Sequence, residues 1–438
     1  MSRTAHQLAV GTGPAPDALS TAERSALRKT AWRFLPLLTI AYLFNYLDRT
    51  AIGVAGLTMN ADLGITNTQL GFAAGLFFLT YTLCEVPSNL ALYRFGARRW
   101  IARIMISWGL ISAAVAFVND LTSLYVLRLL LGAAEAGFFP GIAYFLSAWF
   151  PREHRTRVLA WFLIGIPASS AIGGPLSIAL LQMDGILGLA GWKWLFIMVS
   201  LPCVALGFVV LKVLADRPDE ASWLSKEESG ALKAMLAAET HHRPKTSVLG
   251  AIFDVRIVVL ALVQFGFTLG SYGIGIWMPL ILKEQGLNDM EIAVLLFVPY
   301  TIAVLGMLAW AWLADRTGKK ISNLTLACLL ATFGFGVYML SGSLTFSVVN
   351  LTLALVGITA ARAIFWSIPP RLLTGIAAAG GIAFINMVGT TGGLVGPPMM
   401  GMFRDATGGF ERGILVMAAV MAVTTILALS LKLTVKQE

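Results

Sequence analysis

Twelve apolar stretches, each long enough to cross a lipid bilayer, dominate this sequence. A membrane-spanning helix needs about 20 apolar residues because the hydrocarbon core of a bilayer is about 30 Å thick. Six such stretches occupy residues 34–57, 69–92, 100–118, 122–148, 157–182 and 192–214, and six more occupy 252–282, 291–313, 321–341, 346–373, 378–403 and 412–433. We therefore predict an all-α membrane protein with twelve transmembrane helices.

The composition agrees with a chain surrounded by lipid. Hydrophobic residues make up 57% of the 438 residues and charged residues only 13%, whereas soluble domains carry about 25% charged residues. The mean hydropathy of +0.78 indicates an excess of apolar surface that must face lipid. The net charge of +9 is typical of membrane proteins, which accumulate Lys and Arg in cytoplasmic loops. Nucleic acid is therefore not an expected partner.

Neither a metal site nor a cleaved leader is expected. The three cysteines, Cys84, Cys203 and Cys328, lie inside apolar stretches without the spacing of a metal site or of a disulfide framework. Residues 1–20 are polar and lack the apolar core of a signal peptide. The first span is expected to direct the chain to a bacterial inner membrane, with no cofactor bound.

A polar interval divides the spans into two groups of six. It runs from Asp216 to Lys245, and Ser225 and Glu228 within it have the spacing of a capping box that opens a short amphipathic helix on the membrane surface. We expect a cytoplasmic N-terminal segment (1–31), an N-terminal six-helix bundle (32–214), a cytoplasmic linker (215–250) and a C-terminal six-helix bundle (251–438).

The short loops predict the orientation. Arg and Lys gather in the turns after the second, fourth and eighth spans, whereas residues 58–68 and 341–352 contain neither. Because basic residues accumulate in cytoplasmic loops, both termini are expected in the cytoplasm.

A basic turn recurs at equivalent places in the two halves. Its copies read Arg94-Phe-Gly-Ala-Arg98-Arg99 and Asp315-Arg316-Thr-Gly-Lys319-Lys320. Such a repeat indicates two related bundles that rock around a central site. The turn resembles the signature of the major facilitator superfamily, which implies two pseudo-symmetric six-helix bundles. The first copy departs from that signature, because Tyr93 stands where the family usually has Asp and Asn89 where it usually has Gly.

Six charged residues fall inside the predicted spans, and each costs about 2.5–3.5 kcal/mol near the bilayer centre. They are Asp48, Arg49, Glu85, Arg128, Glu135 and Arg362. Adjacent residues on a helix point about 100° apart, so we expect one of Asp48 and Arg49 to face a central site and the other a neighbouring helix. Residues seven apart lie about 10.5 Å apart along one face, which is too far for Arg128 and Glu135 to pair directly.

The residue types indicate an anionic cargo and protons. The planar fork of Arg binds both oxygens of a carboxylate, and burial raises the pKa of an acid so that it can take up a proton. Arg49 has no evident structural partner in the sequence, which makes it a candidate carboxylate ligand. We interpret Glu85 as either a local polar anchor or a gate.

Several motifs narrow the resemblance to the anion:cation symporters, which include phthalate, hydroxyphenylacetate, tartrate and hexonate permeases. The motifs are Asn45-Tyr46-Leu47-Asp48-Arg49, Pro87-Ser88-Asn89, Arg128 with Glu135-Ala-Gly-Phe-Phe-Pro140-Gly, Phe365-Trp366-Ser-Ile-Pro369, Gly381-Ile-Ala-Phe-Ile-Asn386 and Gly393-Leu-Val-Gly396-Pro397. The resemblance implies that Asp48 and Glu135 bind the co-transported protons. It also implies that Arg49 and Arg128 bind the carboxylate or pair with these acids, and that Tyr46, Tyr81, Trp366 and Asn386 line the central site.

The expected function is proton-coupled import of a small organic acid anion by a non-enzymatic transporter that works as a monomer. Residues 158–181 contain no Asn or Gln for a polyol chain, and candidate wall residues such as Tyr272 and Trp277 are aromatic. An aromatic acid or a compact dicarboxylate is therefore favoured, with Arg362 either reading a second carboxylate or pairing structurally. A sugar-acid symporter, an organic anion exporter or exchanger, and a non-transporting sensor are the alternatives.

Overall fold

The computed structural model describes residues 20–238, 254–338, 340, 343–372 and 375–434, and the regular elements in these ranges are all helical. The first half contains α1 (Thr21–Leu63), α2 (Asn67–Phe95), α3 (Ala97–Ala114), α4 (Leu121–Glu135), α5 (Phe138–Trp149), α6 (Arg152–Leu163), α7 (Gly165–Leu181) and α8 (Gly191–Val213). After α9 (Lys226–Ala238), the second half contains α11 (Val255–Glu284), α12 (Asp289–Thr317), α13 (Lys320–Tyr338), α14 (Leu344–Phe365), α15 (Pro369–Leu372), α16 (Gly375–Thr407) and α17 (Glu411–Thr434).

The prediction of an all-α protein with twelve crossing helices is confirmed. Ten helical segments in the described ranges are long and apolar enough to cross a membrane, and two of them join α4 with α5 and α6 with α7. The other two predicted spans, 34–57 and 378–403, lie within α1 and α16, which are 43 and 33 residues long. Asn45, Asp48 and Arg49 make the middle of α1 unusually polar for a membrane helix.

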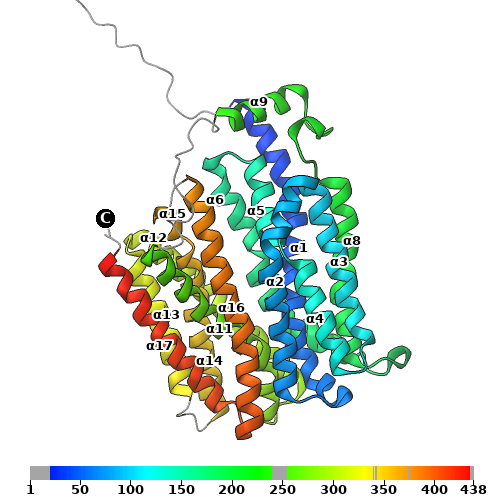
Figure 1. The fold of residues 1–438 in the computed structure, drawn as a ribbon, viewed down its shortest axis with the longest axis vertical. Helices are drawn as coiled ribbons and strands as arrows, with labels where there is room; N and C mark the ends of the chain where they lie inside the picture. Colours follow the sequence, from blue (N-terminus) through cyan, green and yellow to red (C-terminus); the bar gives the residue numbers. More distant parts are fainter. Residues whose placement is uncertain (1–19, 239–253, 339, 341–342, 373–374, 435–438) are drawn as a thin grey trace, which may run out of the picture.

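Two groups of helices lie side by side (Figure 1). In the first half α3 packs on α8 and α2 on α4, and in the second half α11 packs on α16 and α13 on α14 and α17. The halves meet where α2 contacts α16, α7 contacts α12 and α1 contacts α11. This arrangement places α1, α2, α11 and α16 at the interface where the two bundles meet.

Glycines allow close approaches between helices of the two halves. A Cβ added at Gly71 would lie 2.6 Å from the carbonyl oxygen of Pro397, and one added at Gly75 would lie 2.8 Å from that of Leu394. Both contacts join α2 to α16 across the two halves. Small residues are expected where membrane helices approach closely, because packing of backbone on backbone holds them together.

The fourth span is broken, whereas the sequence suggested one continuous helix over 122–148. Pro140 has no N–H to donate to the carbonyl of Ala136, and the Ser88 hydroxyl donates to that carbonyl instead at 2.6 Å. Gly137 then adopts a positive φ of 86°, and a Cβ at this position would lie 2.4 Å from Ser88 Oγ. The break ends α4 at Glu135, so this acid lies at a helix terminus inside the fourth predicted span.

The predicted capping box of the linker is confirmed. Ser225 Oγ accepts from the Glu228 N–H at 3.1 Å and the Ser225 N–H donates to Glu228 at 2.9 Å, which starts α9. Glu228 also accepts from Ser25 and Lys29 of α1. Hydrogen bonds from the Lys29 ammonium, the Ser25 hydroxyl and the Ser225 N–H lower the pKa of Glu228 to about 2, so this carboxylate is ionised at physiological pH.

The docked α9 also explains an earlier start of α1. The sequence analysis placed the first bundle from residue 32, but α1 begins at Thr21 behind a Ser20–Glu23 capping box. Phe34 packs edge-on against Trp223 of the linker, with 5.6 Å between ring centroids. The segment 21–31 is therefore helical, and residues 1–19 and 239–253 lie outside the described residues.

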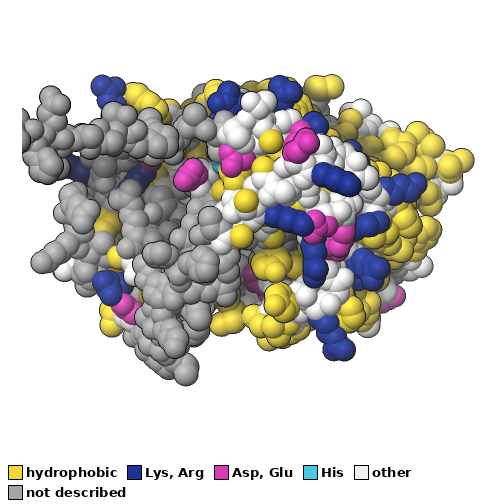
Figure 2. All heavy atoms as spheres, turned by 90° about the horizontal axis from the view of Figure 1, so that it is seen from above, with side chains coloured by type: hydrophobic (Ala, Val, Ile, Leu, Met, Phe, Trp, Pro, Cys, Tyr) yellow, Lys and Arg dark blue, Asp and Glu magenta, His cyan; other side chains and the backbone are white. Residues whose placement is uncertain are grey.

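Basic side chains gather at the end of the molecule where α9 lies. Figure 2 looks onto this end and shows clusters of Lys and Arg over the first half. The exposed basic residues there include Arg24, Arg28, Arg94, Arg99, Lys226 and Lys233. This distribution agrees with the basic loops from which the sequence analysis assigned an orientation.

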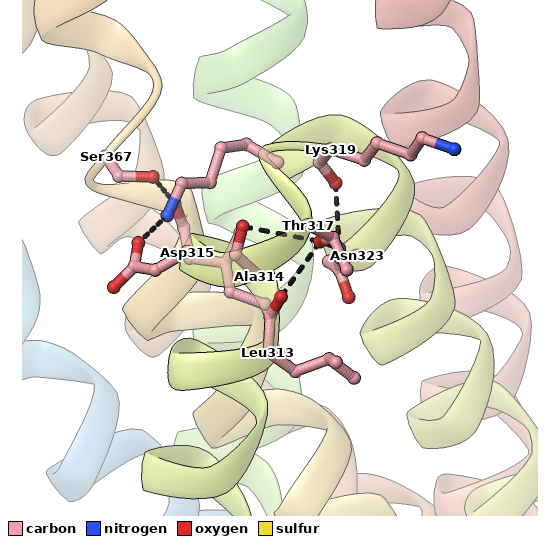
Figure 3. Close-up of polar contacts among 9 residues, drawn as sticks. Leu313, Ala314, Asp315, Thr317, Lys319, Asn323 and Ser367 are labelled. Carbon is pink, nitrogen blue, oxygen red and sulfur yellow. Dashed lines mark hydrogen bonds and ion pairs between the residues drawn. The ribbon is translucent and has the colours of Figure 1, made fainter.

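The two basic turns differ in the position of the Asp that binds them. In the second copy, Lys320 forms an ion pair with Asp315 of the same turn, and Asn323 donates to Thr317 and Lys319 (Figure 3). In the first copy Tyr93 is exposed, and Asp216 after α8 accepts from the Arg98 N–H at 2.9 Å. Asp216 therefore supplies the carboxylate that the first turn lacks.

At the end opposite α9 the halves are joined by Asp405 of α16, which accepts from Asn67 Nδ2 at 2.9 Å and from the Thr68 N–H at 2.7 Å. Hydrogen bonds to a charged acceptor contribute about 1.5–3 kcal/mol each. We therefore expect Asp405→Ala to let the two halves separate at this end in part of the protein molecules. Nitroxide labels on Thr122→Cys and Met290→Cys, in a chain without its three native cysteines, should report a second, longer distance.

The matched control for this variant is Asp184→Ala. Asp184 accepts from the Gly191 N–H within the first half, so its loss should leave the distance distribution unchanged. The same distribution for Asp405→Ala and for the unsubstituted chain would mean that this carboxylate does not hold the halves together.

Candidate substrate and proton site

The central feature of the site is an ion pair between Arg49 of α1 and Glu135 of α4. Arg49 Nε donates to Glu135 Oε1 at 2.6 Å and Nη2 lies 2.5 Å from the same oxygen. Asn45 Nδ2 donates to it as well, at 2.7 Å. Arg49 is 9% exposed and Glu135 is fully buried. The premise that Arg49 has no structural partner is therefore wrong, because its partner lies 86 residues away in the sequence.

The two oxygens of Glu135 are in different environments. Oε1 receives three donors, whereas Oε2 is buried and has no hydrogen-bond partner among the described residues. An unpaired buried acceptor is costly, and binding a proton or a water molecule removes that cost. Oε2 is therefore the atom of this carboxyl group at which a proton can bind without displacing Arg49.

Aromatic rings surround the guanidinium of Arg49. Its Cζ lies 4.7 Å from the ring centroid of Tyr81, 5.3 Å from that of Phe77 and 5.6 Å from that of Tyr46. Nη1 donates to the hydroxyl of Tyr272 at 3.3 Å. Because Tyr272 lies on α11, this bond connects the charged cluster of the first half with the second half.

Asp48 and Arg49 point to different helices, as their spacing predicted. Asp48 accepts from Ser112 and from Trp108 Nε1, the latter at 3.1 Å, and both donors lie on α3. This acid is 1% exposed. It is therefore held inside the first half, whereas Arg49 faces the second.

Arg128 does not pair with Glu135, which agrees with their spacing on one helix face. Its Nε donates to the carbonyl of Ala73 at 3.0 Å and its Cζ lies 5.3 Å from the ring centroid of Phe77. Nη1 is buried and has no partner among the described residues. Arg128 therefore offers a free donor inside the first half.

The second half contributes Arg362 and Trp366 from the end of α14 and the turn that follows it. Arg362 forms no hydrogen bond or ion pair with the described residues, and its Cζ lies 5.8 Å from the ring centroid of Phe267. Trp366 is half-buried and packs edge-on against Phe365.

Asn386 takes part in a polar contact that the sequence analysis did not foresee. Its Nδ2 donates to Glu85 Oε1 on α2 at 2.9 Å, and its Oδ1 accepts from Gln264 Nε2 on α11 at 3.2 Å. Glu85 thus accepts a hydrogen bond from the other half and is not a local anchor on one helix. Gln264, a buried amide in an apolar span, is the signal that could have identified this contact.

One candidate wall residue lies elsewhere. Trp277 is fully buried, and its Nε1 donates to the carbonyl of Pro397 at 3.0 Å within the second half. It therefore packs α11 against α16 and does not line the site.

Comparison with known proteins identifies the family. The model of the Major Facilitator Superfamily matches residues 38–397. The chain belongs to this superfamily. Its members are membrane transporters and not enzymes. The multi-pass helical architecture described above agrees with this family.

Superfamily members that are similar in sequence differ in their named cargo. An Agrobacterium vitis protein named for tartrate transport is 45% identical over 93% of this chain and 92% of its own length. A quinolone resistance transporter of Acinetobacter baumannii is 41% identical over 91% and 93%. In fold, a bacterial homolog of the human lysosomal transporter Spinster, in an inward-facing and occupied conformation, has a TM-score of 0.75 at 15% identity, covering 95% of this chain and 98% of its own.

The ion pair makes a prediction about stability. Removing one member of a buried pair leaves the other charge uncompensated, at a cost of about 3–5 kcal/mol. We expect Arg49→Ala to be more destabilising than the double variant Arg49→Ala/Glu135→Gln, because the amide no longer needs a cation. Denaturant unfolding in detergent micelles measures both. If the losses of the two single variants simply add in the double variant, the two residues do not form the pair described.

Proposed function

We propose that this transporter imports a compact organic dicarboxylate together with protons across a bacterial inner membrane. The observation that carries the proposal is a set of acids and arginines inside the helical spans, some of which join the two halves. It comprises three acids, Asp48, Glu85 and Glu135, and three arginines, Arg49, Arg128 and Arg362. Charges inside a membrane protein are costly and mark the path of ions and substrates.

The arginines support a carboxylate cargo. Arg128 has a buried Nη1 without a partner, and Arg362 has no bonded partner among the described residues. Arg49 faces Tyr272 of the second half and can exchange this neutral partner for an anion. Arginine binds carboxylates through its planar fork, and sites on opposite halves suit the two ends of a dicarboxylate.

Charge balance supports coupling to protons. The three acids and three arginines sum to zero, so a bound dianion gives the cluster a charge of −2, and two protons restore neutrality. Glu135 Oε2 is an open position for one of them. Asp48 is the second candidate, because its donors on α3 keep it buried when the other residues rearrange.

The pH gradient, rather than the membrane potential, gives the direction of dicarboxylate transport. Moving one negative charge into a cell that is negative inside costs about 2.3 kcal/mol per 100 mV. Two protons cancel the charge of a dianion, so its import gains no energy from the membrane potential unless a third proton is carried. A monoanion carried with two protons has a net positive charge, and its import is already driven by the potential. The pH gradient therefore drives dicarboxylate import.

The basic end with α9 is assigned to the cytoplasm, and both termini are assigned there with it. One monomer contains the complete site.

The chemistry of the site favours a compact diacid over an aromatic acid. The faces of Tyr46, Phe77 and Tyr81 are directed at the Arg49 guanidinium, so they offer less free surface to an aromatic ring than the sequence suggested. The resemblance to a protein named for tartrate transport supports the same choice. Tartrate, a four-carbon hydroxy diacid, is the leading candidate.

The competing function is export, which the similarity to a quinolone resistance transporter suggests. Proteoliposomes with an imposed inward proton gradient separate the two functions. Accumulation of labelled tartrate supports proton-coupled import. Uptake that requires a counter-substrate and ignores the gradient, or transport of a quinolone alone, would contradict it.

The two proton sites can be tested by amide substitution. Asp48→Asn and Glu135→Gln each resemble a permanently protonated acid, so we expect gradient-driven accumulation to be lost while exchange of labelled for unlabelled substrate persists. Both reactions are measured in the same proteoliposomes. If either variant accumulates substrate as well as the unsubstituted protein, that acid is not a required proton carrier.

The role of Arg362 is tested with substrates of matched shape. Arg362→Gln should reduce uptake of a dicarboxylate about tenfold or more and should affect the corresponding monocarboxylate much less, because the second acid group has lost its ligand. Trp366→Ala is the matched variant on the same helix end and removes no charge. Equal losses for the mono- and dicarboxylate in Arg362→Gln would mean that this arginine only supports the helix.

A further inference from the structure

A set of polar side chains near the arginines is not explained by binding of carboxylates or protons. Glu85 of α2, Gln264 of α11 and Asn386 of α16 form a hydrogen-bonded chain across the two halves. We propose that Glu85 and Gln264, connected by Asn386, form a binding site for hydroxyl groups, which makes the substrate a hydroxylated dicarboxylate. This inference rests on the proposed function and specifies its substrate class.

The chain of bonds leaves two acceptors open. Glu85 Oε1 and Asn386 Oδ1 are occupied, whereas Glu85 Oε2 and Gln264 Oε1 are buried and have no partner among the described residues. Gln264 as a whole is 5% exposed. Both open atoms accept hydrogen bonds, so the group that satisfies them has to be a donor. A hydroxyl group is a donor, whereas a carboxylate is not.

The site is formed by the local packing of the helices. Gly389 of α16 faces Gln264, and a Cβ at this glycine would lie 2.3 Å from Gln264 Cγ. One helical turn away, Gly393 faces the ring of Phe78, and a Cβ at this glycine would lie 2.8 Å from the nearest ring atoms. These two glycines let a glutamine and an aromatic ring fit between α11, α16 and α2. Any larger residue at position 389 would displace the Gln264 side chain.

The position of these acceptors relative to the arginines suits a short diacid. Glu85 follows Tyr81 by one helical turn, and Tyr81 stacks on Arg49. On α11, Gln264 lies three residues before Phe267, whose ring contacts Arg362, so both face the same side of the helix. Each open acceptor is thus about one turn away from a residue whose ring contacts one of the two guanidinium groups. The hydroxyls of a diacid lie between its two carboxylates, so a diacid held at both ends by arginines would present them to this part of the site.

An alternative role for the three residues is a latch that holds the halves together without touching substrate. A latch affects every substrate by the same factor, because it acts on the protein's conformation. A hydroxyl site affects hydroxylated substrates selectively, because a site built to bond a hydroxyl discriminates against an analogue that lacks it. The ratio of two substrates that differ only in hydroxyl groups distinguishes these roles.

The experiment compares tartrate, malate and succinate, which are four-carbon dicarboxylates with two, one and no hydroxyl groups. Initial rates of proton-driven uptake into proteoliposomes give kcat/KM for each acid. We expect the unsubstituted protein to rank them in that order. Gln264→Met keeps the length of the side chain without its polar atoms, and Glu85→Met does the same on α2. Each should lower the ratio of tartrate to succinate about tenfold, as expected for one lost hydrogen bond.

A matched control is Asn350→Met, which removes a buried amide that donates to the Phe346 carbonyl within α14 and should leave the ratio unchanged. An unchanged ratio in both Gln264→Met and Glu85→Met, with or without a uniform loss of rate, overturns the hydroxyl site and supports the latch. If one variant does not fold, the ratio in the other decides. If the unsubstituted protein takes up none of the three acids on a proton gradient, the proposed function itself fails.

Discussion

The ion pair between Arg49 and Glu135 is the interaction on which the rest of the site depends. Arg49 would be an uncompensated charge inside the membrane without Glu135, and the reverse holds as well. Their geometry leaves Glu135 Oε2 open and directs Arg49 Nη1 to Tyr272 in the other half. Under the proposed function, a proton on the acid weakens its hold on the arginine, and an anion at the arginine takes the place of the acid. Proton and substrate binding then act on one bond.

Polar contacts between the halves are arranged in layers along α2, α11 and α16. Asp405 joins α16 to the start of α2, Tyr272 joins α11 to Arg49 in the middle, and Asn386 joins α16 to Glu85 towards α9. Each of these bonds joins residues of opposite halves and none of them lies inside a bundle. This separation suits alternating access, in which two rigid halves rock around a fixed site.

The sequence was sufficient for features determined by local spacing. Hydropathy identified the spans and the two halves, the Ser225–Glu228 spacing identified the start of α9, and helical geometry identified the divergence of Asp48 from Arg49. Contacts between distant segments could not be derived in this way. The bond of Ser88 to Ala136 that completes the break before α5, the pairing of Arg49 with Glu135 and the place of Gln264 all join residues whose approach is decided by helix packing.

If substrate and protons share one buried set of charges, as we propose, binding an anion raises the proton affinity of the acids. Isothermal titration calorimetry of the detergent-solubilised protein with tartrate, repeated in buffers of different ionisation enthalpy, counts the protons taken up per bound ligand. The account predicts net proton uptake on binding near neutral pH, and less uptake in Glu135→Gln. Binding of tartrate with no proton uptake in any buffer would contradict it.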